Sequence, residues 1–149
     1  MPGQRVVLII EDNPADVRLM REAFRDVHPP VLIHVASDGD EALEFVRKEG
    51  QHATAPRPNL IFLDFNLPKS NSREVLRQLK QDVKLRPIPV AVLTTSESER
   101  DIQDAYQLYA NCYLRKPVEL DSFLSTIQAA VHFWLDVAHL PAGEPDERR

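Results

Sequence analysis

Short, uninterrupted aliphatic runs recur along this chain, and each leads into residues that can handle phosphate or metal. The four runs are Val6 to Ile10, followed by Glu11 and Asp12; Leu60 to Leu63, followed by Asp64; Val90 to Leu93, followed by Thr94; and Cys112 to Leu114, followed by Arg115 and Lys116. Runs of this length without polar alternation are typical of strands buried on both faces, as in a parallel sheet covered by helices. The pattern therefore favours an α/β fold.

Segments with helical spacing lie between the runs. Asn13 is expected to cap a helix that starts at Pro14, and Ser72 to cap the helix after the third strand. A second strand is predicted over Val31 to Ala36, and a long last helix from about Glu119 to about His139. Five strands, each followed by a helix, predict a flavodoxin-like, doubly wound five-stranded parallel sheet in the order 2-1-3-4-5 with five helices.

Length and composition indicate one domain. The 149 residues suffice for a core without disulfides, and we expect a domain over residues 1–140 followed by a flexible tail over 141–149. Cys112 is the single cysteine, so a reducing, cytoplasmic compartment is expected. The net charge of -5 argues against a nucleic-acid surface, and no apolar stretch is long enough to span a membrane.

The predicted topology brings together the polar residues that come directly after the strands. Carboxyl ends of parallel strands share one edge of the sheet, so Glu11, Asp12, Asp64, Thr94 and Lys116 are expected to line one cleft. Oxygen ligands of this kind favour Mg²⁺, which also accepts phosphate oxygens. Asp64 is then the expected nucleophile toward phosphorus, with the lysine neutralising charge on the transferred group. The pattern predicts phosphoryl chemistry on an aspartate.

Other interpretations remain open at this point. Each acidic residue taken alone could merely end a strand or cap a helix. A metal-dependent phosphatase would usually carry a second aspartate two residues after the nucleophile, where this chain has Asn66. A binding module of the same fold that works without phosphorylation needs neither the acids nor the lysine, whereas this chain has them all. A DNA-binding regulator is the weakest alternative, because no basic region or helix-turn-helix follows.

These residues carry a resemblance that covers nearly the whole chain. The segment Phe62-Leu63-Asp64-Phe65-Asn66-Leu67-Pro68 resembles that of response-regulator receiver domains of two-component signalling. The resemblance implies that Asp64 is the phosphoacceptor, and that Glu11, Asp12, Asp64 and the backbone carbonyl of Asn66 bind the metal. It also implies that Thr94 and Tyr113 form the switch, and that the bond between Lys116 and Pro117 is cis. One departure is Ser72, where receivers usually carry glycine.

A narrower resemblance concerns the partner. Asn66-Leu67-Pro68-Lys69, Val92-Leu93-Thr94-Thr95-Ser96, Asn111-Cys112-Tyr113-Leu114 and Phe133-Trp134-Leu135 resemble the stand-alone receivers that partner bacterial phytochrome histidine kinases. It implies a non-enzymatic phosphoacceptor that receives its phosphoryl group from a sensor histidine kinase. Output would then pass through protein contacts, such as return binding to the kinase, a phosphotransfer protein or dimerisation.

The last helix carries more apolar residues than one packing face needs. One stripe comprises Leu120, Leu124, Ile127, Val131, Trp134 and Ala138, and a second comprises Phe123, Ala130, Phe133, Val137 and Leu140. A surface helix needs one stripe to pack on its own sheet. We therefore expect the second stripe to form a homodimer interface, which agrees with the dimers that the resemblance implies.

Overall fold

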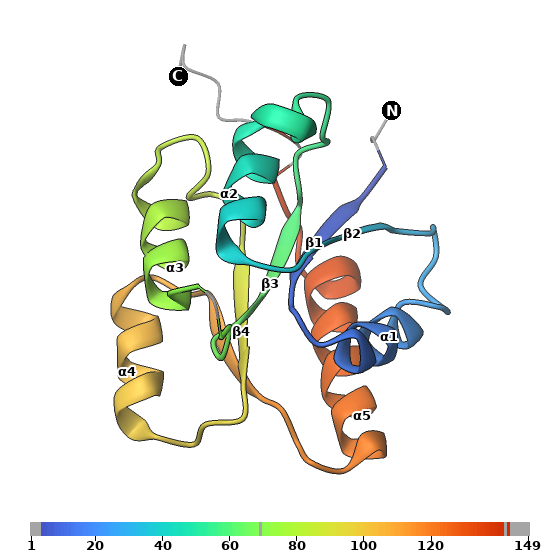
Figure 1. The fold of residues 1–149 in the computed structure, drawn as a ribbon. Coiled ribbons are helices and arrows are strands. Elements are labelled where there is room, and N and C mark those ends of the chain that lie inside the picture. Colours follow the sequence, from blue (N-terminus) through green and yellow to red (C-terminus); the bar gives the residue numbers. More distant parts are fainter. Residues whose placement is uncertain (1–3, 69, 142, 144–149) are drawn as a thin grey trace.

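A computed structural model describes residues 4–68, 70–141 and 143. Figure 1 shows the fold, in which five strands form one parallel sheet surrounded by helices. The strand order is β2-β1-β3-β4-β5, as predicted from the sequence. The strands are β1 (Val6–Ile10), β2 (Leu32–Ala36), β3 (Leu60–Asp64), β4 (Val90–Thr94) and β5 (Cys112–Arg115). The predicted strands Val6 to Ile10, Leu60 to Asp64 and Val90 to Thr94 are confirmed. The limits of β2 and β5 each differ by one residue from the predictions, Val31 to Ala36 and Cys112 to Leu114.

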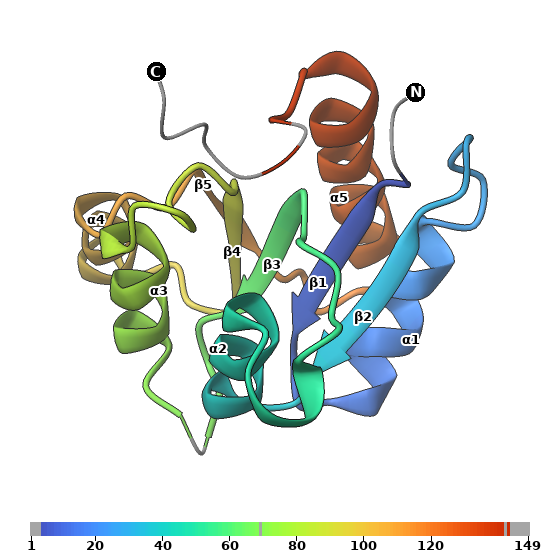
Figure 2. The same ribbon diagram turned by 90° about the horizontal axis from the view of Figure 1, so that it is seen from above.

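Helices cover both faces of this sheet (Figure 2). They are α1 (Pro14–Ala23), α2 (Gly39–Arg47), α3 (Ser72–Gln81), α4 (Glu99–Gln107) and α5 (Leu120–Val131), with a short 3₁₀ turn at Gly50–His52 and a π-helical continuation of α5, η2, at His132–Val137. Helices α2, α3 and α4 lie on one face, and α1 and α5 on the other. The five-helix α/β prediction is therefore confirmed.

Strand residues alternate between two hydrophobic cores because successive side chains point to opposite faces. Leu8, Ile61 and Val92 pack under α2, α3 and α4, whereas Ile9 and Phe62 pack under α1 and α5. The central strands are buried throughout, which explains why their sequences lack polar alternation.

Local signals set the helix starts. Asn13 caps α1, as expected, by accepting a hydrogen bond from a backbone N–H group, and Ser98 caps α4 in the same way. The prediction for Ser72 was wrong, because Asn71 caps α3 and Ser72 is the first helical residue. A capping side chain must stand just outside the helix, and the asparagine one position earlier meets that condition.

The last helix differs from its prediction in length and in its faces. It ends at Val137, and its final six residues are π-helical. Phe123 and Ala130 are buried against the sheet together with Ile127 and Val131, so these four residues form one packing face instead of belonging to two stripes. Leu120, assigned to the core stripe, is 63% exposed.

The physical reason is helical geometry. Positions 123, 127, 130 and 131 follow the i, i+4, i+7, i+8 spacing of a single broad face. Phe133 and Val137 remain largely exposed, whereas Leu140 packs partly against the core. Most of the predicted tail, namely residue 142 and residues 144–149, lies outside the described residues.

Candidate functional site

The carboxyl ends of β1 and β3 bring three acids together, as the sequence predicted. Oxygen atoms of Glu11, Asp12 and Asp64 all lie within 4.8 Å of one another. Glu11 and Asp64 are 2% and 3% exposed, whereas Asp12 faces solvent. Two buried acids and one accessible acid form a site that a cation can enter from one side.

Lys116 reaches this cluster from the end of β5. Its Nζ lies 2.5 Å from Glu11 Oε1, 3.4 Å from Asp64 Oδ2 and 3.0 Å from Asp16 Oδ2. Burial opposes the charged form of this lysine, but the hydrogen bond and charge of Glu11, together with the other two acids, outweigh it and raise the pKa. The ammonium group therefore stays charged among the carboxylates.

The pKa of Glu11 is also shifted by its surroundings. Burial, together with the neighbouring Asp64 carboxyl, raises the pKa of Glu11 to about 7, although Lys116 counteracts the rise. Like charges held this close favour an added positive charge. Three carboxylates around a small space are the donor set that a hard divalent cation such as Mg²⁺ or Mn²⁺ accepts, so the residues present fit a metal.

Backbone contacts shape the loop after Asp64. The N–H of Asn66 donates to Asp64 Oδ1 at 2.9 Å, and the hydroxyl of Ser72 donates to the backbone carbonyl oxygen of Asp64 at 2.8 Å. Ser72 does not have a positive φ, so this position needs no glycine here. Its hydroxyl instead ties the start of α3 to the end of β3.

The hydroxyl of Thr94 is turned toward Asn66. It donates to the side-chain oxygen of Asn66 at 2.8 Å, and the backbone N–H of Ser96 donates to the same hydroxyl at 3.1 Å. Tyr113 is half-buried and donates its hydroxyl to the carbonyl oxygen of Ser96 at 2.9 Å. The two predicted switch residues therefore meet at the loop between β4 and α4.

A hydrogen bond joins the loop between β4 and α4 to α4, and ion pairs join α4 to α3. Ser96 Oγ donates to Asp101 at 2.6 Å, which lowers the pKa of that carboxyl, and Arg73 of α3 pairs with Asp101 and with Asp104. Arg73 also lies 4.9 Å from the ring centroid of Phe65. These contacts connect the loop that follows Thr94 to α3 and α4.

A pocket of about 260 Å³ opens beside the exposed acid. It is lined by Asp12, Ser37, Asp38, Leu67, Pro68 and Ser70, which come from the loops after β1, β2 and β3. A phosphoryl donor could approach the acids from this side.

Sequence reasoning missed Asp16. This acid lies in the first turn of α1 and is not among the predicted site residues, yet its carboxylate contacts Lys116. No local signal marks Asp16, because Asp12 lies outside α1 and the contact with Lys116 joins residues 100 positions apart. The implied cis bond at Pro117 is also not found: among the described residues the cis peptide joins His28 and Pro29.

Comparisons with known proteins agree with this geometry. Residues 7–128 match the model of the response regulator receiver domain. The chain is 42% identical to response regulator Rcp1 of Synechocystis sp., covering 93% of this chain and 94% of Rcp1.

Solved structures give the same result. The phosphorylated cyanobacterial phytochrome response regulator RcpA matches with 42% identity and a TM-score of 0.90, covering 93% of this chain and 99% of RcpA. The Mn²⁺-bound form of Rcp1 matches with 42% identity and a TM-score of 0.89, and the match covers 93% of this chain and 99% of that structure's chain. With the acid cluster and its lysine at the strand ends, these matches show that the chain belongs to the response regulator receiver family of two-component systems.

Proposed function

We propose that this protein is a response regulator in which Asp64 accepts a phosphoryl group from a sensor histidine kinase. The observation that carries the proposal is the buried Asp64 carboxylate, clustered with Glu11 and Asp12 and 3.4 Å from the Lys116 ammonium. In the transfer, a carboxylate oxygen of Asp64 forms a bond to phosphorus while the bond from phosphorus to the kinase histidine breaks. The product is an acyl phosphate.

Glu11, Asp12 and Asp64 would hold Mg²⁺, with the backbone carbonyl of Asn66 as a further ligand. When bound, the ion neutralises charge on the phosphoryl oxygens and on the acids. The Mn²⁺-bound structure of Rcp1 supports this assignment. Lys116 would exchange its contact with Asp64 for one with a phosphoryl oxygen, as a flexible point charge.

The switch would start from the hydrogen bond between Thr94 and Asn66. A phosphoryl group on Asp64 offers a charged acceptor, and charge-assisted hydrogen bonds are stronger than neutral ones. Thr94 would then turn from Asn66 toward the phosphoryl group, altering its bond with the Ser96 N–H. Tyr113, bonded to Ser96, would follow, and the surface around α4 and β5 would change.

The similarity to RcpA supports a bacterial phytochrome as the kinase. Output would pass through protein contacts, either with the kinase, with a phosphotransfer protein or with a second copy. For the second copy, Phe133 and Val137 are the members of the predicted interface that remain about half exposed, at 49% and 55%. No described helix is long and apolar enough to cross a membrane.

Phosphorylation of the purified protein by acetyl phosphate with Mg²⁺ tests the proposal. Intact-mass spectrometry should show one added phosphoryl group on the wild type and none on Asp64→Asn, because an amide cannot form the acyl phosphate. Asp26→Asn, which changes an exposed acid outside the cleft, is the matched control and should be phosphorylated normally. Undiminished phosphate on Asp64→Asn would overturn the assignment.

A further inference from the structure

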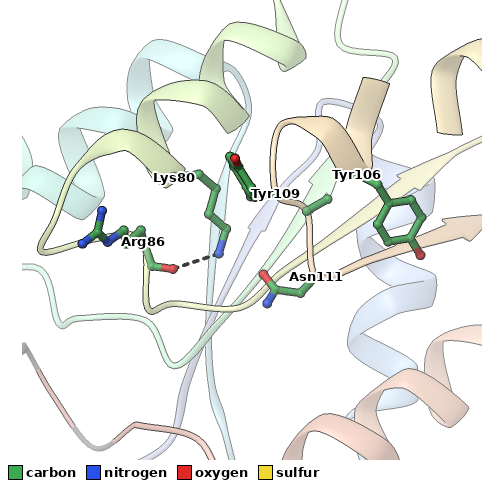
Figure 3. A pocket seen from close by; sticks show the side chains of 6 residues that line it. Lys80, Arg86, Tyr106, Tyr109 and Asn111 are labelled. Carbon is green, nitrogen blue, oxygen red and sulfur yellow. Dashed lines mark hydrogen bonds between the residues drawn. The ribbon is translucent and has the colours of Figure 1, made fainter. Parts of the chain in front are cut away.

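A second pocket lies at the opposite edge of the sheet from Asp64. It has a volume of about 590 Å³ and is lined by Lys80, Arg86, Tyr106, Tyr109, Ala110 and Asn111 (Figure 3). These residues come from the end of α3, the connection to β4, and the end of α4 with the turn into β5. The volume falls in the range of small-molecule sites.

Lys80 is the most unusual residue of this pocket. Its side chain is 9% exposed, and Nζ donates to the carbonyl oxygens of Arg86 at 3.0 Å and Ile88 at 2.8 Å. No carboxylate in the described part of the chain pairs with it, and burial lowers the pKa of its amine to about 8. An ammonium group has three N–H donors, so one remains for a further acceptor. A buried cation without an anion is costly, and an anionic ligand would remove that cost.

Asn111 supplies a second donor. Its side-chain oxygen accepts the backbone N–H of Val90 at 2.8 Å, which fixes the orientation of the amide. The NH₂ half has no acceptor among the described residues and is left for a ligand. Figure 3 shows Lys80 Nζ directed toward the carbonyl of Arg86, with Asn111 near it, while the guanidinium of Arg86 extends to one side. None of the lining residues is acidic, so the pocket is cationic.

Tyr109 gives the pocket an aromatic wall at a cost to the backbone. Its φ of 70° is left-handed, the position after a helix where glycine is usual. The N–H groups of Tyr109 and Ala110 bond to the carbonyls of Tyr106 and Ala105, which completes the helix-ending motif. The ring is 75% exposed and gains little from burial in the folded chain. The strained backbone and the exposed ring together indicate that Tyr109 has a role in binding.

We propose that this pocket binds a small organic anion in which a carboxylate or phosphate group stands beside a flat ring. The anionic group accepts from Lys80 and Asn111, and the ring lies against Tyr109, with Tyr106 and Arg86 at the rim. The site does not depend on phosphorylation of Asp64, because it lies at the other end of the strands and shares no residue with the acid cluster.

Calorimetric titration and amide NMR of the full chain test the proposal with four probes. Benzoate and AMP carry the two anionic groups beside a ring, benzamide is the neutral counterpart, and inorganic phosphate lacks the ring. Binding of benzoate or AMP, together with changes in the amide chemical shifts of Tyr109 and Asn111, supports the proposal. Whichever of the two compounds binds more tightly identifies the preferred anionic group. The proposal would be overturned if neither benzoate nor AMP binds, if benzamide binds as tightly as benzoate, or if inorganic phosphate binds as tightly as AMP.

Variants separate binding from folding. Asn111→Asp keeps the oxygen that accepts from Val90 but replaces the NH₂ donor by a negative oxygen, so affinity should fall by about tenfold or more. Lys80→Gln should have a similar effect, and Lys84→Gln, an exposed neighbour, should have none. Tyr109→Gly should weaken binding several-fold and raise the thermal midpoint, because glycine relieves the left-handed backbone. Unchanged binding in Asn111→Asp or Tyr109→Gly would refute the proposal.

Discussion

Thr94 Oγ1 donates a hydrogen bond of 2.8 Å to the side-chain oxygen of Asn66, so the predicted switch hydroxyl is held by the residue two positions after Asp64. The backbone N–H of Thr95 also donates to this oxygen, at 3.2 Å. A phosphoryl group on Asp64 must compete with Asn66 for the threonine. The side chain of Asn66 would therefore oppose the proposed switch, whereas its backbone carbonyl is the proposed metal ligand.

Removing this competition should favour the phosphorylated conformation. Asn66→Ala keeps the backbone carbonyl but frees the Thr94 hydroxyl, and a neutral hydrogen bond contributes about 1 kcal/mol. We expect a phosphoryl mimic such as beryllofluoride to bind up to about fivefold more tightly, measured by fluorescence or NMR titration with Mg²⁺. Thr94→Ser, which keeps the hydroxyl, is the control. Weaker binding in Asn66→Ala would mean that the amide contacts the phosphoryl group instead.

Metal affinity should depend on Asp12 more than on Lys116. Asp12→Ala removes the accessible carboxylate of the cluster and should weaken Mg²⁺ binding by about tenfold or more. Lys116→Ala removes a competing cation that contacts Glu11 and Asp64, so Mg²⁺ binding without phosphate should be retained. Calorimetric Mg²⁺ titrations of the three proteins decide the matter, and equal affinities of wild type and Asp12→Ala would refute the ligand role.

Self-association should depend on Phe133. Its ring is 49% exposed and packs edge-to-face with Trp134, at 5.1 Å between centroids, so a charge at this position does not enter the core. Phe133→Glu is expected to shift a dimer toward monomer and to leave phosphorylation of Asp64 intact, as sedimentation would show. Glu44→Gln, an exposed position on α2 at the opposite face of the sheet from α5, serves as a control. Wild-type protein that stays monomeric at high concentration, with and without beryllofluoride, would contradict the dimer.

Gly39 should tolerate no larger side chain. A Cβ at this position would lie 2.5 Å from Val75 Cγ2 and 3.2 Å from Ser70 Cβ, between α2 and α3. Gly39→Ala should therefore lower the free energy of unfolding by about 1–3 kcal/mol. Gly143→Ala is the matched control, because nothing lies within 4 Å of the added atom. Urea denaturation measures both, and equal midpoints would show that the helices separate easily.

Lys80 predicts a pH dependence of stability. Between pH 8 and 10.5 the unfolded chain holds the proton on this amine and the folded chain does not, so raising the pH through this interval favours folding. Relative to Lys80→Gln, wild type should gain at most about 3 kcal/mol. The other ionisable side chains of the pocket, Arg86, Tyr106 and Tyr109, are present in both proteins. A constant difference across the interval would contradict the lowered pKa.

The sequence determined the sheet, the strand order and the acid cluster. Continuous apolar runs specify strands buried on both faces, and parallel connections place Glu11, Asp12 and Asp64 at one edge whatever the details of packing. Local caps such as Asn13 were also readable, because a cap acts on its own helix.

Only the tertiary structure decided contacts between segments distant in the chain. Lys116 meets Asp16 from 100 residues away, and Ser72 bonds to the carbonyl of Asp64 instead of capping its helix. Phe123 and Ala130 were assigned to a partner surface, yet they pack on the monomer's sheet, because the broad apolar face of α5 is wide enough to include them. Which side chains a helix buries depends on how it is rotated against the sheet, and a linear pattern with two adjacent stripes does not specify that rotation.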